Sequence, residues 1–486
     1  MTQRIEGKFA AHDRHHFELK LGYSLNPEEK KNKYNIELYY FIPKSLGINH
    51  HTYSKRQFYN DIQGYIRFKT PTFSFEALAD QTNTLSPLTK IKKFLENDPE
   101  RKRLIAEIKL FACTLRVALR NEITYIRRKF RKGETDEAVE KIGTLCNGLK
   151  KCLYQFRALG PKLDQSSIDN DSRLIYRHAD EYIGIATDSL LNSIHNTIVD
   201  SITDRTLVTE LNSVIMPLIK SEFDYRKNKG YAIYTTDSEN ELFLYRKGIL
   251  KKIITNILFL NTHTEESLTN VKELIFAMAA GIAMVIFVFV SFWAGQRWSA
   301  SSIPFALALV LGYIVKDRFK DWFKILFSNK MTRWFADLKT DILDPATDDK
   351  IGVCRQAFSF LSKTDIPKQI LLTRRQNTSE EFWIPEDIIK YEKDVTLFPK
   401  HILKSHTRRR DVTDIIRFNV HQFLERMDEP FEIRRALDTQ TEELVEFKCA
   451  RVYHVNLMLK LEDELRRIRL VLNQNGIVRI EEVKQS

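Results

Sequence analysis

Residues 274–293 form an apolar run without one ionisable side chain, and this run constrains the fold more than any other feature. A helix rises 1.5 Å per residue, so a run of this length extends about 30 Å, which is the hydrocarbon thickness of a bilayer. Soluble cores rarely need so many successive apolar residues. The run lies mid-chain, and the first residues contain no apolar stretch, which argues against a cleaved signal peptide. The sequence therefore predicts a membrane-spanning helix at about 274–293.

A second, shorter apolar segment lies between Arg297 and Lys316. Its strongly apolar part is 303–315, a length that fits a re-entrant or interfacial helix as well as a span. Tryptophans on both sides of the connection favour a full crossing, because their rings concentrate at the headgroup level. We predict a transmembrane hairpin over 262–315, with a second span at about 299–315, and a re-entrant second helix is the alternative.

The distribution of basic residues predicts the orientation of this hairpin. The short connection carries only Arg297, whereas several lysines and arginines follow the second segment. Basic residues accumulate on the cytoplasmic side of membrane proteins. The five cysteines are scattered and odd in number, which suits a reducing compartment. The expected localisation is a multi-pass integral membrane protein with two spans and both termini in the cytoplasm, in a plasma membrane or a bacterial inner membrane.

Small residues recur at four-residue spacing within both apolar segments. Ala277 and Gly281 lie near the start of the first, and Ala308 and Gly312 lie at similar depth in the second. Small residues let membrane helices approach closely. We therefore expect Ala277 to lie level with Gly312, and Gly281 level with Ala308. Neither segment contains an acidic or basic residue of the kind that marks an ion pathway, so anchoring is the expected role.

The segment 316–345 alternates basic residues with an aromatic stripe at helical spacing. A helix of this kind beside a membrane span is typical of one lying in the headgroup plane, where each basic residue attracts anionic lipid. The alternative is that the stripe packs against the cytoplasmic domains. The residues expected to contact the anionic cytoplasmic leaflet are Lys316, Arg318, Lys320, Trp322, Phe323, Lys324 and Trp334.

The regions before the hairpin differ in their hydrophobic period. Residues 1–80 contain strand-like alternation at 16–23 and 34–42, separated by a polar turn, which is a hairpin-like signal. Residues 81–261 show long amphipathic helical patterns, typical of a bundle. The helical region is the expected site of a protein partner or of homo-oligomer contacts.

The last region, 346–486, is predicted to be a small α+β domain. Helical pieces are expected near 350–361 and 411–427, and an Asn-Gly turn at 473–476 favours a hairpin. The predicted strands are 450–461, 465–472 and 477–483. Whether strands near the N-terminus share this sheet stays open. The predicted fold class is therefore mixed α+β and predominantly helical: a membrane protein with a cytoplasmic helical bundle, a two-helix transmembrane hairpin and a C-terminal α+β domain.

The sequence contains no motif that identifies a reaction. Phosphate-loop, dinucleotide-binding, zinc-protease and nucleophile-elbow patterns are all missing. No catalytic residue, cofactor-binding residue or metal ligand is therefore predicted, and no small-molecule substrate can be named. The net charge of +12 favours anionic partners, but the basic runs lack the interleaved aromatics of a single-strand platform, so nucleic acid is not expected.

These observations favour a membrane-anchored cytoplasmic interaction or scaffold protein, with a signalling role included in that class. Two alternatives remain at this point. One is a membrane-tethered enzyme with its site in the C-terminal domain, and the other is an oligomeric membrane effector or pore.

Overall fold

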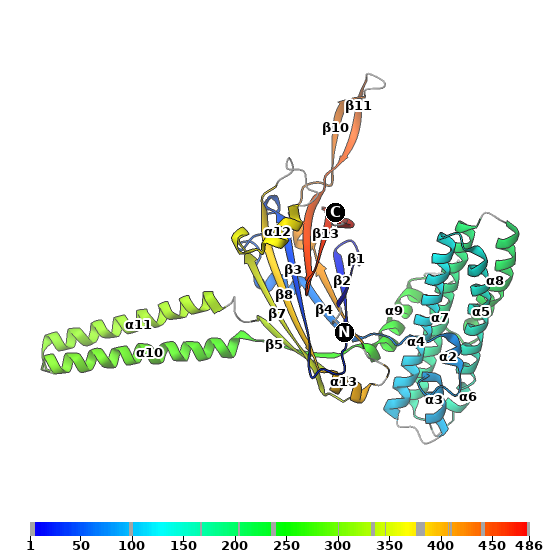
Figure 1. The fold of residues 1–486 in the computed structure, drawn as a ribbon, viewed down its shortest axis with the longest axis horizontal. Coiled ribbons are helices and arrows are strands. Elements are labelled where there is room, and N and C mark those ends of the chain that lie inside the picture. The colour runs from blue at the N-terminus through cyan, green and yellow to red at the C-terminus, as the bar shows by residue number, and fades with distance from the viewer. Residues whose placement is uncertain are drawn as a thin grey trace. The chain divides into compact units, whose positions relative to one another are not determined.

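The computed structural model describes residues 5–96, 101–165, 168–202, 205–234, 240–299, 301–331, 336–345, 347–375, 384–406, 408, 411–438 and 443–483. The chain divides into two compact units (Figure 1). We call the first the sheet unit, which comprises Met1–Arg67, Leu260–His406 and Arg410–Ser486. We call the second the helical unit, which is mainly Phe68–Phe259.

The sheet unit contains three antiparallel sheets. Its described strands are β1 (Ile5–Ala11), β2 (His16–Ser24), β3 (Asn32–Pro43), β4 (Ile62–Phe68), β5 (Asn261–Glu266), β6 (Leu338–Leu343), β7 (Lys350–Leu361), β8 (Glu386–Leu397), β9 (Asp411–Asn419), β10 (Phe431–Leu437), β11 (Leu444–Ala450), β12 (Tyr453–Leu461), β13 (Glu464–Asn473) and β14 (Gly476–Val483). The eight-stranded sheet has the order β14-β13-β12-β3-β8-β7-β6-β5, the four-stranded sheet the order β1-β2-β9-β4, and β10 pairs with β11. Short helices connect them: α1 (Lys55–Asp61), α12 (Lys368–Arg375), α13 (Pro399–Ser405) and α14 (His421–Leu424), with 3-10 turns at Lys44–Leu46 and Lys363–Asp365.

The core of the sheet unit lies between the four-stranded and eight-stranded sheets. Aromatic rings from both sheets meet there: Tyr40 of β3 and Phe418 of β9 have ring centroids 5.2 Å apart, and Tyr23 of β2 and Tyr34 of β3 stack at 4.7 Å. These side chains are almost completely buried. Strand alternation directs every second residue into this layer, which is why each strand contributes apolar residues at a period of two.

Strands from the two ends of the chain share one sheet. The N-terminal strand β3 lies between β8 and β12, and it pairs with β8 over its whole length and with β12 over residues 36–41. The hairpin-like signal at 16–23 and 34–42 was misleading, because β2 and β3 belong to different sheets. The polar connection between them passes from one sheet to the facing one, so it does not close a hairpin.

Two predicted helical pieces are strands. Residues 350–361 form β7, and much of 411–427 forms β9. Both strands lie inside a sheet, with a paired neighbour on each side. Burial does not alternate strictly along either strand: Ile351 and Gly352 are both buried in β7, and residues 414–416 are all buried in β9. The period of two that identifies a strand is therefore weakened. The three strands predicted near the C-terminus correspond to β12, β13 and β14.

The helical unit is built from long helices around one apolar core. Its helices are α2 (Phe75–Ala79), α3 (Pro87–Glu96), α4 (Arg101–Arg131), α5 (Thr135–Arg157), α6 (Gly160–Leu163), α7 (Asn170–Ser201), α8 (Arg205–Asn228) and α9 (Glu241–Thr255), followed by a 3-10 turn at Asn256–Leu258. On α4 the buried residues include Leu104, Ile108, Leu115, Leu119 and Ile126. Their spacing places them on one face, which packs against the neighbouring helices.

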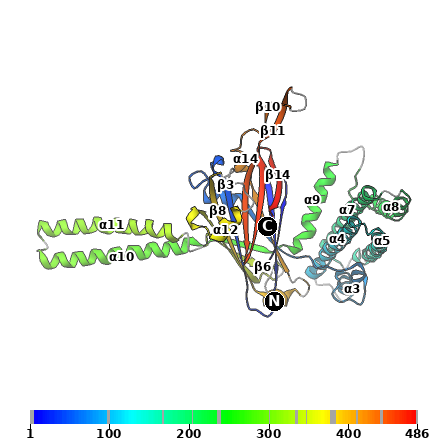
Figure 2. The ribbon, with the colours of Figure 1, turned by 45° about the horizontal axis from the view of Figure 1, so that its top comes forward.

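Two further helices, α10 (Leu268–Arg297) and α11 (Ile303–Met331), form an antiparallel pair that we call the helical hairpin (Figures 1 and 2). Strand β5 directly precedes α10, and β6 follows α11 in the chain. Because β5 and β6 pair in register, the chain enters and leaves the hairpin at neighbouring strands.

The prediction of a predominantly helical membrane protein with two spans is wrong. Of the helices in the described part of the chain, one is long and apolar enough to cross a membrane, namely Phe276–Arg297 with a mean hydropathy of 2.3. Helix α11 is too short in its apolar part to cross a membrane, because that part ends at Val315, after about 20 Å at 1.5 Å per residue. Lys316 and Asp317 then follow within the same helix. A multi-pass localisation with two crossings and two cytoplasmic termini is wrong for the same reason.

The Asn-Gly turn between β13 and β14 leads to a stability prediction. Gly476 has φ = 129°, and a Cβ at this position would collide with the backbone of Arg14. We expect Gly476→Ala to lower the free energy of unfolding by about 1–3 kcal/mol, because backbone strain and the contact add. Urea unfolding followed by circular dichroism measures this. Gly143→Ala in α5 is the control, since its Cβ meets open space and alanine favours a helix. An equal loss of unfolding free energy in Gly476→Ala and Gly143→Ala would contradict the prediction.

Candidate functional site

The first candidate site is the outer surface of the helical hairpin. Large apolar side chains are exposed along both helices of the pair. We call them the hairpin exterior: Met278, Ile282, Met284, Val285, Val288, Phe289, Phe292 and Trp293 of α10, with Ile303, Leu307, Val310, Leu311, Tyr313, Ile314 and Val315 of α11. Phe289 is 73% exposed and Ile303 is 77% exposed. Exposed apolar surface of this extent marks an interaction site in folded proteins.

A narrow face of α10 holds the two helices together. Ala279, Ala283 and Ala294 are buried, and their spacing places them on one side of the helix. Gly312 of α11 is also buried, with Val290 of α10 beside it. Small residues at this contact allow close approach. The remaining circumference of α10 over this length is apolar and exposed, so the hairpin exterior is not a single stripe.

The structure does not bring together the small residues that were expected to lie at equal depth in the two helices, namely Ala277 with Gly312 and Gly281 with Ala308. Gly312 lies against Phe287 and Val290, more than two turns along α10 from Ala277. Ala277 is exposed, and a Cβ on Gly281 would meet open space. Ala308 is half-buried. Neither expected pair meets in this structure, and a packing role for these residues within lipid stays a prediction. Sequence reasoning missed the buried alanines, whose four-residue spacing was the available signal.

The predicted membrane-contact residues lie along the second half of α11. The Lys316 ammonium lies 3.9 Å from the ring centroid of Tyr313 and 5.8 Å from that of Phe287. Arg318 and Trp322 are exposed, and Lys320 is half-buried. Cations therefore begin where the apolar part of α11 ends.

Three other predicted contact residues cannot be placed in this way. Phe323 and Lys324 belong to α11, but the description does not extend to their side chains. Trp334 lies outside the described residues. Contact of all seven residues with anionic lipid stays a prediction.

The second candidate site is a cavity of about 180 Å³ inside the sheet unit. Strand β4 contributes Ile62, Gly64 and Ile66, and Ile416 comes from β9. The facing sheet contributes residues from β5, β6, β7 and β8. Tyr59 of α1 lies near one end, where its hydroxyl donates to Asp337 at 3.0 Å. The cavity therefore lies between the two sheets.

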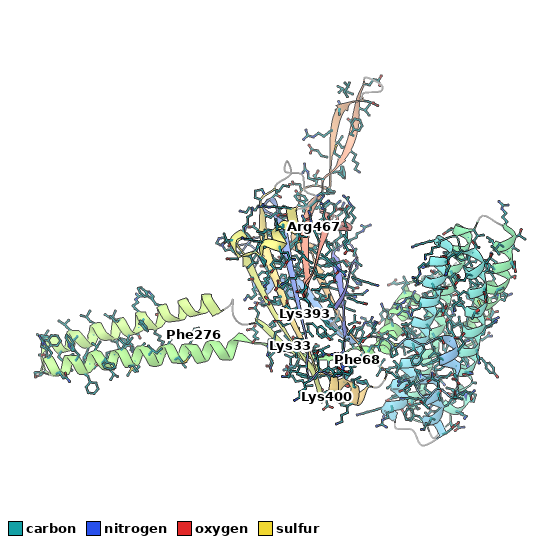
Figure 3. The ribbon with its side chains drawn as sticks, viewed as in Figure 1. Lys33, Phe68, Phe276, Lys393, Lys400 and Arg467 are labelled. Carbon is teal, nitrogen blue, oxygen red and sulfur yellow. The ribbon has the colours of Figure 1, made fainter. Side chains whose placement is uncertain are left out.

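A buried ion pair adjoins this cavity. The Lys393 ammonium on β8 lies 2.6 Å from Asp414 Oδ2 on β9, and both side chains are almost fully buried. Figure 3 labels Lys393 within the sheet unit. The Tyr23 hydroxyl donates to the same carboxylate at 2.8 Å. Burial alone lowers the pKa of Lys393, but the charge of Asp414 outweighs it and holds that pKa above its usual value. Lys393 is therefore a cation at neutral pH.

Sequence reasoning missed Lys393 although a signal was present. Inward-facing positions of β8 alternate as Ile389, Tyr391, Lys393, Val395 and Leu397. A charged residue in an otherwise apolar inward series indicates a buried ion pair or a binding group. Its partner Asp414 is on a strand that was predicted to be helical.

The chemistry of the cavity argues against covalent catalysis. Burial raises the pKa of the Cys354 thiol to about 12, so this lining residue is a neutral thiol near pH 7. Lys393 is protonated, as described above. Neither group is a nucleophile in these states. Within the described ranges, no group of three or more His, Cys, Asp or Glu residues could hold a metal ion.

The helical unit has an open groove of about 1000 Å³ between α7 and α9. Exposed Leu242 and Tyr245 of α9 and Leu174 of α7 line it. At its base, Arg246 donates to Glu181 at 2.6 Å, which joins the two helices. Arg177 and Lys229 also line the groove, so apolar and charged side chains alternate along it. Mixed apolar and polar surface is typical of contacts with another protein.

Comparison with family models, with curated proteins and with solved structures finds no match to this chain. Its function must therefore be argued from the side chains alone.

Proposed function

We propose that the chain is a membrane-attached interaction protein, in which the hairpin exterior contacts lipid and the rest of the chain receives protein partners. The observation that carries this proposal is the apolar circumference of the hairpin. A helix that packs into one partner needs one apolar face. Between Met278 and Val315, exposed apolar side chains occupy most of the surface of the two helices that does not face the other helix.

Lipid is the occupant that fits this surface. Hydrocarbon chains cover a helix pair from all sides, whereas a single protein partner covers one side. Each large side chain transferred from water contributes about 1.5–3 kcal/mol. Only 11% of the apolar window of α10 is buried within the chain, so it is not a core helix. Lipid contact of this kind requires no second crossing helix.

The basic residues of α11 support an anionic lipid surface. Lys316, Arg318 and Lys320 follow the exposed apolar part of that helix, and Asp317 and Asp321 lie among them, so this short segment has an excess of one positive charge. Each such cation near a membrane surface contributes about 1 kcal/mol of attraction to anionic lipid. Strands β5 and β6 keep the two ends of the hairpin together, so attachment holds the sheet unit at the membrane.

Flotation of the full chain with lipid vesicles tests the proposal. We expect the protein to float with vesicles, and to bind anionic vesicles more tightly than neutral ones. The double variant Phe289→Glu with Phe292→Glu is expected to lose at least tenfold in binding, because a charged side chain in hydrocarbon costs about 2.5–3.5 kcal/mol. The matched control is Leu242→Glu with Leu244→Glu, which changes two exposed leucines of α9.

Two results would overturn lipid attachment. One is a chain that stays in the bottom fraction of the flotation gradient and self-associates through the hairpin. In that case a second copy of the chain, and not lipid, covers the hairpin exterior. The other is equal vesicle binding by the hairpin variant and the wild type.

A further inference from the structure

The cavity between the two sheets of the sheet unit has one polar wall and one apolar wall, and it has no role in lipid attachment. Its apolar wall comes from Ile62 and Ile66 of β4 and Ile416 of β9. Its polar groups are on the opposite sheet: Thr340, Gln356, Tyr391 and Lys393. A ligand that fits both surfaces has a polar head and an apolar body.

The polar side of the cavity is rich in hydrogen-bond donors. An ammonium has three N–H groups, and Asp414 is the partner recorded for Lys393 in the described part of the chain. The Tyr391 hydroxyl donates to Gln356 Oε1 at 2.8 Å, which leaves the amide N–H groups of Gln356 as donors. The Thr340 hydroxyl also lines this side, where it shares a hydrogen bond of 2.9 Å with the Thr264 hydroxyl. Donors that converge on one space select an oxyanion.

The charge and volume of the cavity narrow the choice of anion. Lys393 and Asp414 are neutral as a pair, so a single negative charge is easier to place beside them than the double charge of a phosphate. The volume of about 180 Å³ exceeds the share of one water, about 30 Å³, and is smaller than pockets for drug-sized ligands, about 300–1,000 Å³.

The cavity has an entrance. Thr262 and Thr264 of β5 line it and are exposed, and β5 is the last strand of its sheet. Gly64 of β4 is exposed as well, and a Cβ at this position would lie 3.9 Å from Lys393 Nζ. A ligand that enters beside β5 therefore reaches the ammonium without separating the sheets.

We propose that this cavity binds a short-chain monocarboxylate, with its carboxylate at Lys393 and its hydrocarbon chain against the isoleucines of β4 and β9. The site is one of binding, because Cys354 and Lys393 are held in non-nucleophilic forms. The proposal does not depend on lipid attachment through the hairpin.

Isothermal titration of the full chain with hexanoate tests this site. We expect one hexanoate per chain. Gly64→Val places methyl groups in the cavity beside Lys393 Nζ and leaves the ion pair intact, so binding is expected to fall at least tenfold. The matched control is Gly22→Val, a strand glycine of the same sheet whose Cβ makes only ordinary contact with Glu6. Its affinity is expected to equal that of the wild type.

Competition experiments test the chemistry of the ligand. Hexan-1-ol, which has the same chain without the carboxylate, is expected to bind at least tenfold more weakly, and inorganic phosphate is expected not to compete. The site is overturned if the folded chain binds no hexanoate, or if Gly64→Val binds it as the wild type does. The assignment of a monocarboxylate is overturned if phosphate or hexan-1-ol competes as well as hexanoate.

Discussion

Asp414→Ala is expected to destabilise the sheet unit by about 3–5 kcal/mol, because it leaves a buried cation without its counter-charge. Asp414 is fully buried, with the Lys393 ammonium 2.6 Å away. Its loss also removes the acceptor of the buried Tyr23 hydroxyl. Urea unfolding gives the change in free energy, and hydrogen exchange of β8 and β9 assigns it to this layer.

Two variants make this experiment specific. Asp394→Ala changes an exposed aspartate on the same strand as Lys393 and is expected to cost less than about 0.5 kcal/mol. Replacing both charges, with Lys393→Met and Asp414→Leu, is expected to cost less than Asp414→Ala alone, since two apolar groups leave no buried charge. An Asp414→Ala variant as stable as Asp394→Ala would contradict the assigned role of the pair.

The same pair gives a pH dependence with a definite sign. The pKa of Lys393 in the folded chain is above its ordinary value of 10.5. The cation therefore contributes stability that is complete below about pH 10.5 and is lost as the pH rises through the folded pKa. The stability of the wild type relative to the doubly neutral variant should therefore fall as the pH rises through that alkaline range.

Arg157→Ala is expected to destabilise the helical unit by about 3–5 kcal/mol, by the same mechanism. Arg157 of α5 donates two parallel hydrogen bonds of 2.7 Å to Glu222 of α8. It also donates to Asp180 of α7 at 3.1 Å and lies 3.6 Å from the ring centroid of Tyr225. Both carboxylates are nearly inaccessible to solvent, so alanine would leave two buried negative charges and disconnect three helices.

Two further variants, Arg157→Lys and an exposed control, show which property of Arg157 stabilises the helical unit. Lysine keeps the charge but cannot form the paired hydrogen bonds of a guanidinium, so we expect an intermediate loss. Arg177→Ala removes an ion pair with Asp164 in which both side chains are more than 60% exposed. Such pairs contribute about 0–1 kcal/mol, so this variant should unfold nearly as the wild type does. Thermal unfolding of all three variants ranks their stabilities. Equal losses of stability for Arg157→Ala and Arg177→Ala would contradict the role assigned to Arg157.

The features that local residues determine were predictable. Strands β12 to β14 are short runs rich in leucine and β-branched residues, and an Asn-Gly pair closes the last turn. The long apolar helix at 274–293 was also evident, because a run of that composition favours a helix without help from distant residues. Whether the helix pair crosses a membrane depends on α11 as well as on α10, because both helices must be apolar over the same depth. Helix α11 becomes charged at Lys316, while α10 is still apolar beside it.

The features that depend on distant residues were not predictable. Strands β7 and β9 were predicted to be helical, whereas β9 pairs with β2 from the other end of the chain and β7 pairs with β6 and β8. The cavity likewise requires β4, β5 and β8 to come together from positions separated by long stretches of sequence. Its charged wall depends on Lys393 and Asp414, which stand on strands of different sheets.

The sequence by itself determined where an exposed apolar helix pair could form and where the C-terminal strands lie. Both follow from interactions among near neighbours. Only the tertiary structure decided that β3 is a central strand between β8 and β12, that the hairpin begins and ends at paired strands, and that a lysine faces an internal cavity. The physical reason is that strand pairing and buried ion pairs depend on distance in space, which the order of residues along a chain does not contain.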